Sequence, residues 1–389
     1  MLHFLRSFKS KNIAVIAITT VLCGILLFVN LYPNPQPDIG TKERAKVLSV
    51  DDSGLMTVGL VQQGTQKLEV EVQSGRWKGT KFQAHNQLRA QMDLDKIFKP
   101  GDTVLVAVLN DADPKTSVIY AQDHYRIGYT LLLFGLFAVC LLIFGGTTGA
   151  CALLSFVFTC LVIWKLVVPL CLLGWSAIAV CFTAVTIFCA VIIFLVAGVS
   201  RKGFAAFSGA FLGVLASCLT AYLFTYLFNI SGAVMPYSSA LLYSGFERLS
   251  LSDIYIGAIF LSSSGAVMDL AMDVATGMQE VADKQPNITR SQLLGSGLTI
   301  GRAVVGTMTT TLLLAYSGGY LTLMMMFAAQ GTTPTDFMNN PYVASESVKT
   351  LVGSFGLVLV APFTAITGVF LFNKNTATSE THFPYNNQD

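Results

Sequence analysis

The stretch from residue 253 to residue 280, DIYIGAIFLSSSGAVMDLAMDVATGMQE, decides the fold class of this chain. It is long and apolar enough to cross a lipid bilayer as a helix, which takes about 20 residues. Small and polar residues recur in it at helical spacing, which places them on one face of the helix. They are Ala258, Ser262, Gly265, Asp269, Asp273, Thr276 and Glu280. The sequence therefore predicts a membrane helix with one small and acidic face.

The carboxylates of this face are the first candidates for function. An acid inside a membrane span costs about 2.5–3.5 kcal/mol, and such groups often mark a path for protons or ions. Asp269 lies deepest and is the strongest candidate for that role. Asp273 and Glu280 approach the expected cytoplasmic interface, where simple hydration is the alternative interpretation. The small residues Ser262 and Gly265 would let another helix approach closely.

The next span, residues 298–317, supplies further polar candidates. Arg302 lies near its cytoplasmic start, at the depth of the inner carboxylates, so we expect it to pair with Asp273. The alternative is an arginine that snorkels to the interface. Thr309 and Thr310 could line a polar path or bond back onto their own helix. The sequence leaves both pairs of alternatives open.

The composition agrees with a membrane protein. Of 389 residues, 53% are hydrophobic and only 12% are charged, with a net charge of +2. A soluble chain usually carries about 25% charge. These values exclude an ordinary soluble enzyme, a disordered protein and a basic nucleic-acid-binding protein.

The apolar runs predict a polytopic α-helical membrane protein with about eight transmembrane helices. They occupy residues 12–31, 127–145, 148–167, 175–198, 204–229, 253–275, 298–317 and 350–373. The first run is longer than the apolar region of a usual signal peptide, about 7–15 residues, and is interpreted as an anchor. Residues 320–329 are too short to cross and are expected to form a re-entrant or interfacial helix.

Between the first two spans the chain changes character. Residues 33–126 hold 24 of the 46 charged residues. Six short β-strand patterns, separated by glycine-rich turns, indicate a small β-barrel, with the OB-fold as the candidate. They run over residues 44–50, 55–62, 66–73, 80–85, 102–109 and 116–121, with turns expected at Gly54, Gly64, Gly75, Gly79 and Pro100. This domain could bind a partner or act as a spacer.

The loop cations predict the orientation. With the N-terminus in the cytoplasm, the inner segments hold eight lysines and arginines and the outer loops, Lys349 among them, hold three, as the positive-inside rule requires. We therefore expect a bacterial plasma-membrane protein with both termini inside and residues 33–126 outside. The predicted parts are a tail and anchor (1–32), the outer domain (33–126), a multi-span domain (127–373) and a cytoplasmic tail (374–389).

The sequence offers no sign of catalytic or metal chemistry. The eight cysteines all lie in apolar runs without a C-x-x-C pair, and the four histidines are scattered. No H-E-x-x-H motif occurs, and Ser262–Ser264 has no evident base. We expect a protein that is not an enzyme and that has no metal, no cofactor and no nucleic-acid partner.

Two motifs carry a resemblance to a known family. The run from Ser264 to Asp269 with the following Ala-Met resembles the Gly-Ala-Ile-Met-Asp signature of YibE/F-like membrane proteins. The run Gly301–Arg302, continuing through Gly306–Thr309, resembles the second motif of that family, although Ala303 replaces its usual Asp and Thr310 its common Asn. The resemblance implies a membrane protein of unassigned biochemical function. It also implies a second YibE/F-like subunit or a second copy of the chain as a partner.

Two functions remain open at this point. The first is a permease or transport component, coupled to protons through Asp269 and Asp273. The order of anchor, outer domain and acidic helix is similar to that of resistance–nodulation–division proteins, which use membrane acids in this way. The second is a non-transporting scaffold whose outer domain docks a partner.

Overall fold

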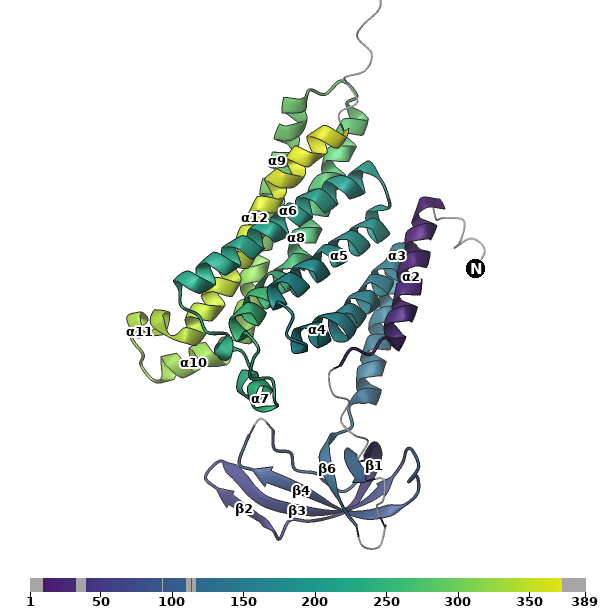
Figure 1. Cartoon of the computed structure of the whole chain (residues 1–389), viewed down its shortest axis with the longest axis vertical. Helices are drawn as coiled ribbons and strands as arrows, with labels where there is room; N and C mark the ends of the chain where they lie inside the picture. Colours follow the sequence, from purple (N-terminus) through teal and green to yellow (C-terminus); the bar gives the residue numbers. More distant parts are fainter. Residues whose placement is uncertain (1–9, 33–39, 93, 110–112, 114–116, 373–389) are drawn as a thin grey trace, which may run out of the picture. The chain divides into compact units, whose positions relative to one another are not determined.

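The computed structural model describes residues 10–32, 40–92, 94–109, 113 and 117–372 (Figure 1). The chain divides into two compact units. The first, residues 34–140, contains all the strands, and the second combines residues 1–33 with residues 141–389. The predicted cytoplasmic tail, 374–389, lies outside the described residues.

The strands of the first unit close into a barrel. Hydrogen bonds join them in the order β1, β5, β6, β4, β3, and β3 pairs back with β1, so that five strands close the barrel. The additional strand β2 extends from the edge of β3. Among the described strands, β4 and β6 form the one parallel pair. The bounds are β1 Gly40–Asp51, β2 Leu55–Val58, β3 Val61–Val72, β4 Lys81–Arg89, β5 Thr103–Leu109 and β6 Val118–His124.

The barrel confirms the predicted strands with two corrections. The segment 55–62, expected as one strand, is a hairpin, because the backbone turns at Gly59 with a φ of 62°. Gly64, expected in a turn, lies inside β3 opposite Leu55. The alternation predicted for β3 is observed, since Leu68, Val70 and Val72 are buried in the barrel.

Three polar side chains of this barrel are buried among the described residues, and Gln66 is the most buried of them. Gln66 is fully buried, and its amide nitrogen donates to Asp52 Oδ1 at 2.8 Å and to the carbonyl of Phe98 at 3.0 Å. Its amide oxygen accepts from Asn86 at 3.0 Å and from the backbone N–H of Phe98 at 3.1 Å. A buried amide is tolerated when its hydrogen bonds are made. This residue therefore fastens the segment around Phe98 onto β3.

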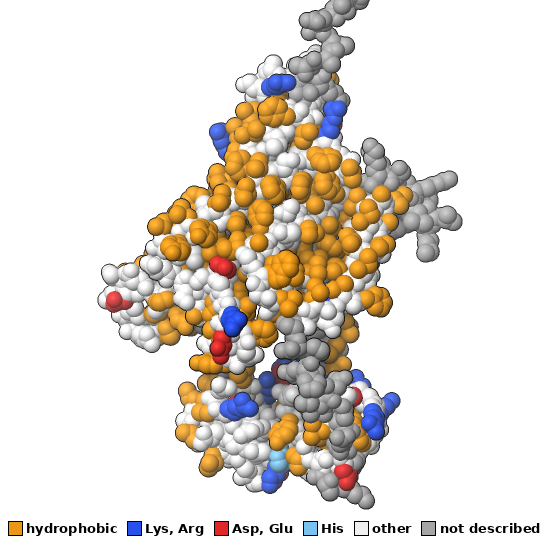
Figure 2. Space-filling view, in the orientation of Figure 1, with side chains coloured by type: hydrophobic (Ala, Val, Ile, Leu, Met, Phe, Trp, Pro, Cys, Tyr) orange, Lys and Arg blue, Asp and Glu red, His pale blue; other side chains and the backbone are white. Residues whose placement is uncertain are grey.

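The helices belong to the second unit, except that α3 begins in the first, and most of them are long and apolar. Their bounds are α2 Ser10–Phe28, α3 Ile127–Val162, η1 Ile163–Val167, α4 Val168–Leu172, α5 Ala177–Ala197, α6 Arg201–Leu227, η2 Gly232–Val234, α7 Ser238–Tyr243, α8 Leu251–Lys284, α9 Arg290–Gly319, α10 Leu321–Ala329, α11 Pro334–Asn339 and α12 Pro341–Phe372. In the described part of the chain, six helical segments are long and apolar enough to cross a membrane, and α2 carries a shorter apolar run. Figure 2 shows hydrophobic side chains over most of the visible surface of this unit, as a membrane protein requires.

The first of these six segments runs from Ile127 to Leu172 and contains a sharp break. At Gly146 the backbone leaves helical geometry, with φ 53° and ψ −124°. A Cβ placed on Gly149 would collide with the carbonyl of Leu141. Residues eight apart in a straight helix are separated by about 12 Å. The chain therefore turns back on itself at Gly146 and makes two helical halves.

The centre of the helical unit is the packing of α6, α8 and α12, which run side by side (Figure 1). Glycines allow their backbones to approach, as is usual between membrane helices. A Cβ on Gly213 of α6 would lie 3.0 Å from both Val267 of α8 and Val360 of α12. The apolar face of α8 fills this core, and Ile259, Leu270 and Ala271 are fully buried in it.

Several predicted spans are longer as helices than expected, α12 most clearly, whereas the predicted short helix keeps its bounds. The last span was expected to begin at residue 350, but α12 begins at Pro341 and brings Lys349 into the helix. The earlier start follows from Pro341, because proline is favoured in the first turn of a helix. Residues 320–329, expected as a short non-crossing helix, form the nine-residue helix α10.

We predict that Gly209→Val destabilises the helical unit. A Cβ at Gly209 would lie 2.8 Å from the Cα of Thr364 on α12, so the helices would have to separate. Overpacking of this kind costs about 1–3 kcal/mol. Thermal unfolding of the full chain in detergent would measure the loss. Gly135→Val is the matched control, because no atom lies within 4 Å of its Cβ position. Equal stability of the two variants would contradict the packing.

Candidate functional site

The acidic face predicted for α8 exists and points away from the core. Ser262, Gly265, Asp269, Asp273, Thr276 and Glu280 are all exposed, whereas the opposite face of the helix is buried. A Cβ on Gly265 would meet no atom within 4 Å. We call these six residues the α8 stripe. At Ser262 and Gly265 the stripe lines a cavity of about 560 Å³ together with Ala152 and Phe156 of α3.

The two inner carboxylates of the stripe lie one turn apart, because four residues rise by about 6 Å along a helix. Within the described residues, neither Asp269 nor Asp273 forms an ion pair or accepts a hydrogen bond. A carboxylate at membrane depth is stable when it faces water, a cation or another polar chain. The two carboxylates therefore need water, a cation or a polar chain from outside the described residues beside them.

Glu280 has a different environment from the other two acids. Its carboxylate forms an ion pair with Lys284 at 2.9 Å, and the side chains of Glu280 and Lys284 are 64% and 75% exposed. Ion pairs of this exposed type contribute little to stability. The position of Glu280 at the end of α8 therefore favours a hydrated interface over a buried path.

The predicted pair between Arg302 and Asp273 is not formed within the chain. Arg302 is exposed, and no carboxylate of the described residues lies within the 4.0 Å limit of an ion pair. Arg302 and Asp273 lie at the same level along their helices, as predicted, but their side chains do not point toward each other. The neighbour of Asp273, Val274, is the residue that packs toward Gly301 of α9. Adjacent residues of a helix point about 100° apart, so both charged side chains turn away from the α8–α9 contact.

The polar residues of α9 divide between two roles. Thr309 donates to the carbonyl of Val305 in its own helix at 2.9 Å, which supports the alternative of bonding back. Thr310 is exposed on the outer side of the helix. Ser262 of the α8 stripe lies 3.1 Å from the hydroxyl of Tyr316. This bond is the direct polar link between the stripe and α9.

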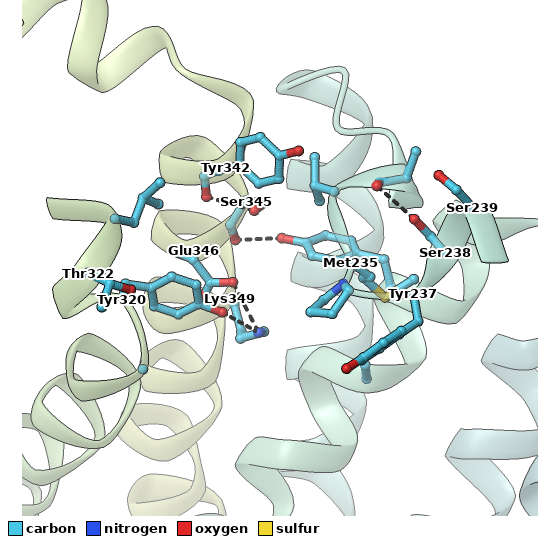
Figure 3. A pocket seen from close by; sticks show the side chains of 17 residues that line it. Met235, Tyr237, Ser238, Ser239, Tyr320, Thr322, Tyr342, Ser345, Glu346 and Lys349 are labelled. Carbon is cyan, nitrogen blue, oxygen red and sulfur yellow. Dashed lines mark hydrogen bonds and ion pairs between the residues drawn. The ribbon is translucent and has the colours of Figure 1, made fainter. Parts of the chain in front are cut away.

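A second candidate site lies where α8 begins, α9 ends and α12 begins (Figure 3). A cavity of about 490 Å³ opens there, bounded on one side by the segment that carries Met235 and Tyr237. Its polar lining includes Tyr255, Tyr320 and Glu346. We call this space the tyrosine cavity.

An ion pair lies in the wall of the tyrosine cavity. The ammonium of Lys349 is 3.1 Å from Glu346 Oε1 and 3.4 Å from the hydroxyl of Tyr320. The two charged side chains are mostly buried, with 17% of Glu346 and 23% of Lys349 exposed. The other carboxylate oxygen of Glu346, Oε2, is buried and accepts no hydrogen bond from the described residues. The hydroxyl of Tyr255 donates to the carbonyl of Ser345 at 2.6 Å and fixes α8 against α12 beside the pair.

This pair was not predicted from the sequence, because the last predicted span begins at residue 350, just after Lys349. A signal was present in the sequence. Glu346 and Lys349 stand three residues apart, which places them on one helical face, and they follow Pro341 at a favourable helix start. Apolar residues surround both of them. Such a pattern predicts a charged pair carried into the first turns of a membrane helix.

Comparison with known proteins gives two matches. The sequence model of the YibE/F-like protein family matches residues 133–374, and that of the YibE/F family N-terminal domain matches residues 38–122. The curated proteins and the solved structures yield no match. The two matched regions together cover most of the chain. In the described residues, no group of three His, Cys, Asp or Glu side chains could hold a metal ion.

We predict that the Glu346–Lys349 pair is energetically coupled. Removing one partner strands the other charge in a mostly buried site, so Glu346→Gln and Lys349→Met should each cost up to about 3 kcal/mol. The double variant should lose less than the sum of both. Thermal unfolding in detergent measures all three. The exposed pair Glu280–Lys284, changed in the same way, is the control and should give a coupling of about 0.5 kcal/mol or less. If the losses of stability from Glu346→Gln and Lys349→Met simply add in the double variant, the two side chains are not energetically coupled.

Proposed function

Because the chain belongs to the YibE/F-like protein family, we propose that it is a permease or transport component of the bacterial plasma membrane, not an enzyme, coupled to proton movement through α8. The observation that carries this proposal is the exposure of Asp269 and Asp273 on a helix whose other face forms the core. An acid that served the fold alone would have a partner in the chain. These two have none among the described residues.

The exposed stripe also defines the kind of assembly that we propose. Two carboxylates that faced lipid would cost about 2.5–3.5 kcal/mol each on insertion scales. A second YibE/F-like subunit, or a second copy of this chain, placed against the α8 stripe would remove that cost. The proton path would then lie between two subunits. Small residues such as Gly265 would allow the close approach that this contact needs.

The outer barrel favours a second candidate function. We propose that this closed barrel, in which β4 and β6 are parallel, is OB-like. A polar cavity of about 530 Å³ lies on it, lined by His85, Gln87, Tyr120 and Gln122 among others. Loops and faces of OB barrels serve as binding surfaces. The alternative is therefore a non-transporting scaffold whose barrel docks a partner.

The proposed topology has eight spans, with both termini in the cytoplasm and the barrel outside. The six long segments become seven when the break at Gly146 separates two crossings, and α2 supplies the eighth. The first half, about 19 residues before Gly146, is long enough to cross. An even number of spans keeps both termini on one side.

This topology predicts that Lys78→Cys is labelled from outside intact cells, whereas Gln285→Cys is not. Lys78 lies on an exposed turn of the barrel, and Gln285 follows the end of α8. A membrane-impermeant maleimide measures access at each position. Permeabilised cells are the control, and both positions should react there. Labelling of residue 285 alone in intact cells would reverse the orientation.

The transport proposal predicts that Asp269→Asn abolishes proton flux while the fold is retained. The asparagine keeps the size of the side chain but cannot release a proton. Proton movement into vesicles that contain the purified full chain can be followed with an internal pH dye. We expect a loss of at least about tenfold, as for a group essential to the path. Asp253→Asn, the same change in the first turn of α8, is the control. Unchanged flux in Asp269→Asn would refute a proton role.

A further inference from the structure

The tyrosine cavity is separate from the acidic stripe and has the size of a ligand site. Its volume of about 490 Å³ falls within the range of about 300–1,000 Å³ that small-molecule sites occupy. Figure 3 shows its side chains converging from the segment before α8, from the end of α9 and from the first turns of α12. Such convergence of distant segments around polar groups is typical of a binding site.

The ion pair in its wall still has hydrogen-bonding capacity on both charges. An ammonium carries three donors, and those of Lys349 have Glu346 Oε1 and the hydroxyl of Tyr320 as their described partners. One donor is therefore available. Glu346 Oε2 is a buried acceptor without a hydrogen bond among the described residues. A buried carboxylate oxygen without a hydrogen bond is rare, so a group that donates a hydrogen bond to this carboxylate is expected to bind here.

We propose that the tyrosine cavity binds a zwitterionic group in which a primary ammonium stands close to a phosphate or carboxylate. The ammonium donates to the carboxylate of Glu346, whose side chain is 17% exposed, and the anion accepts from Lys349. A ligand with both charges matches the pair, which has no net charge of its own. A purely cationic or anionic ligand would satisfy one residue and repel the other. This inference does not depend on whether the protein transports protons.

The aromatic walls support the cationic half of this ligand. Tyr237, Tyr320 and Tyr342 all line the cavity, and the Lys349 ammonium already lies 5.8 Å from the centre of the Tyr320 ring. Ring faces attract cations at this distance. A ligand ammonium beside Glu346 would therefore meet both a carboxylate and tyrosine rings.

A neighbouring apolar cavity indicates two sources for such a group. It has a volume of about 280 Å³, shares Tyr320 and Glu346 with the tyrosine cavity and is lined by Leu313, Phe337 and Met338. A free metabolite would occupy the tyrosine cavity alone. A phosphatidylethanolamine molecule would place its headgroup at the ion pair and an acyl chain in the apolar cavity. Both sources present the same ammonium and anion.

The test is selectivity between two probes of equal charge. Phosphoethanolamine has a primary ammonium, whereas phosphocholine has a quaternary one that cannot donate a hydrogen bond. Binding of each to the full chain in detergent is measured by calorimetry, and the lipid arm measures retention of phosphatidylethanolamine against phosphatidylcholine by native mass spectrometry. We expect at least a tenfold preference for the ethanolamine compound in one of the two arms. The free-probe arm identifies a soluble ligand, and a preference confined to the lipid arm identifies a lipid.

Variants then locate the binding site. Glu346→Gln should lower that preference at least tenfold, and Glu247→Gln, an exposed residue away from the cavity, should leave it unchanged. Thermal unfolding checks that both variants are folded. If Glu346→Gln does not fold, the probe selectivity of the unmodified chain still decides the matter. Equal binding of ethanolamine and choline compounds in both arms, or a preference that Glu346→Gln retains, overturns the proposal.

Discussion

The two faces of α8 govern the rest of the helical unit. Its apolar face packs into α6 and α12 through glycine contacts, and this packing fixes the rotation of the helix about its own axis. Once that rotation is fixed, the acidic face has only one direction left, away from the core formed with α6 and α12. The position of every carboxylate on α8 is thus a consequence of core packing, because the side chains of a helix cannot turn independently of one another. Function on this face depends on whatever covers it.

The sequence was sufficient to predict features that depend on periodicity. A helical repeat places Ser262, Gly265 and Asp269 on one face whatever the surroundings, and strand alternation places Leu68 and Val70 inside the barrel. Periodicity does not predict which other helix or strand packs against a given face. Arg302 and Asp273 have matching depths, and depth follows from counting residues. Their directions follow from the packing of Val274 and Gly301, which no single helix determines.

The charged pair of the tyrosine cavity was missed for a related reason. Hydropathy places the start of a span where charges cease, so Glu346 and Lys349 were assigned to a loop before α12. In the structure they belong to the first turns of that helix and neutralise each other. An ion pair lowers the free-energy cost of burying two charges. A hydropathy average treats each residue separately and cannot include this effect. The hydroxyl that also accepts from Lys349 belongs to Tyr320 at the end of α9, 29 residues away in the sequence.

The stripe and the cavity are joined by one residue of α9. Tyr316 bonds to Ser262 of the stripe through its hydroxyl, and its side chain also lines the apolar cavity beside Glu346. Tyr320, one turn further on, contacts the ion pair itself. A ligand that displaced these rings would therefore act on the outer end of the stripe without touching an aspartate. Energetic coupling between two sites needs such a physical connection, and it also needs an element with two arrangements. The end of α9 meets the first of these conditions, because Tyr316 contacts the stripe and Tyr320 contacts the ion pair.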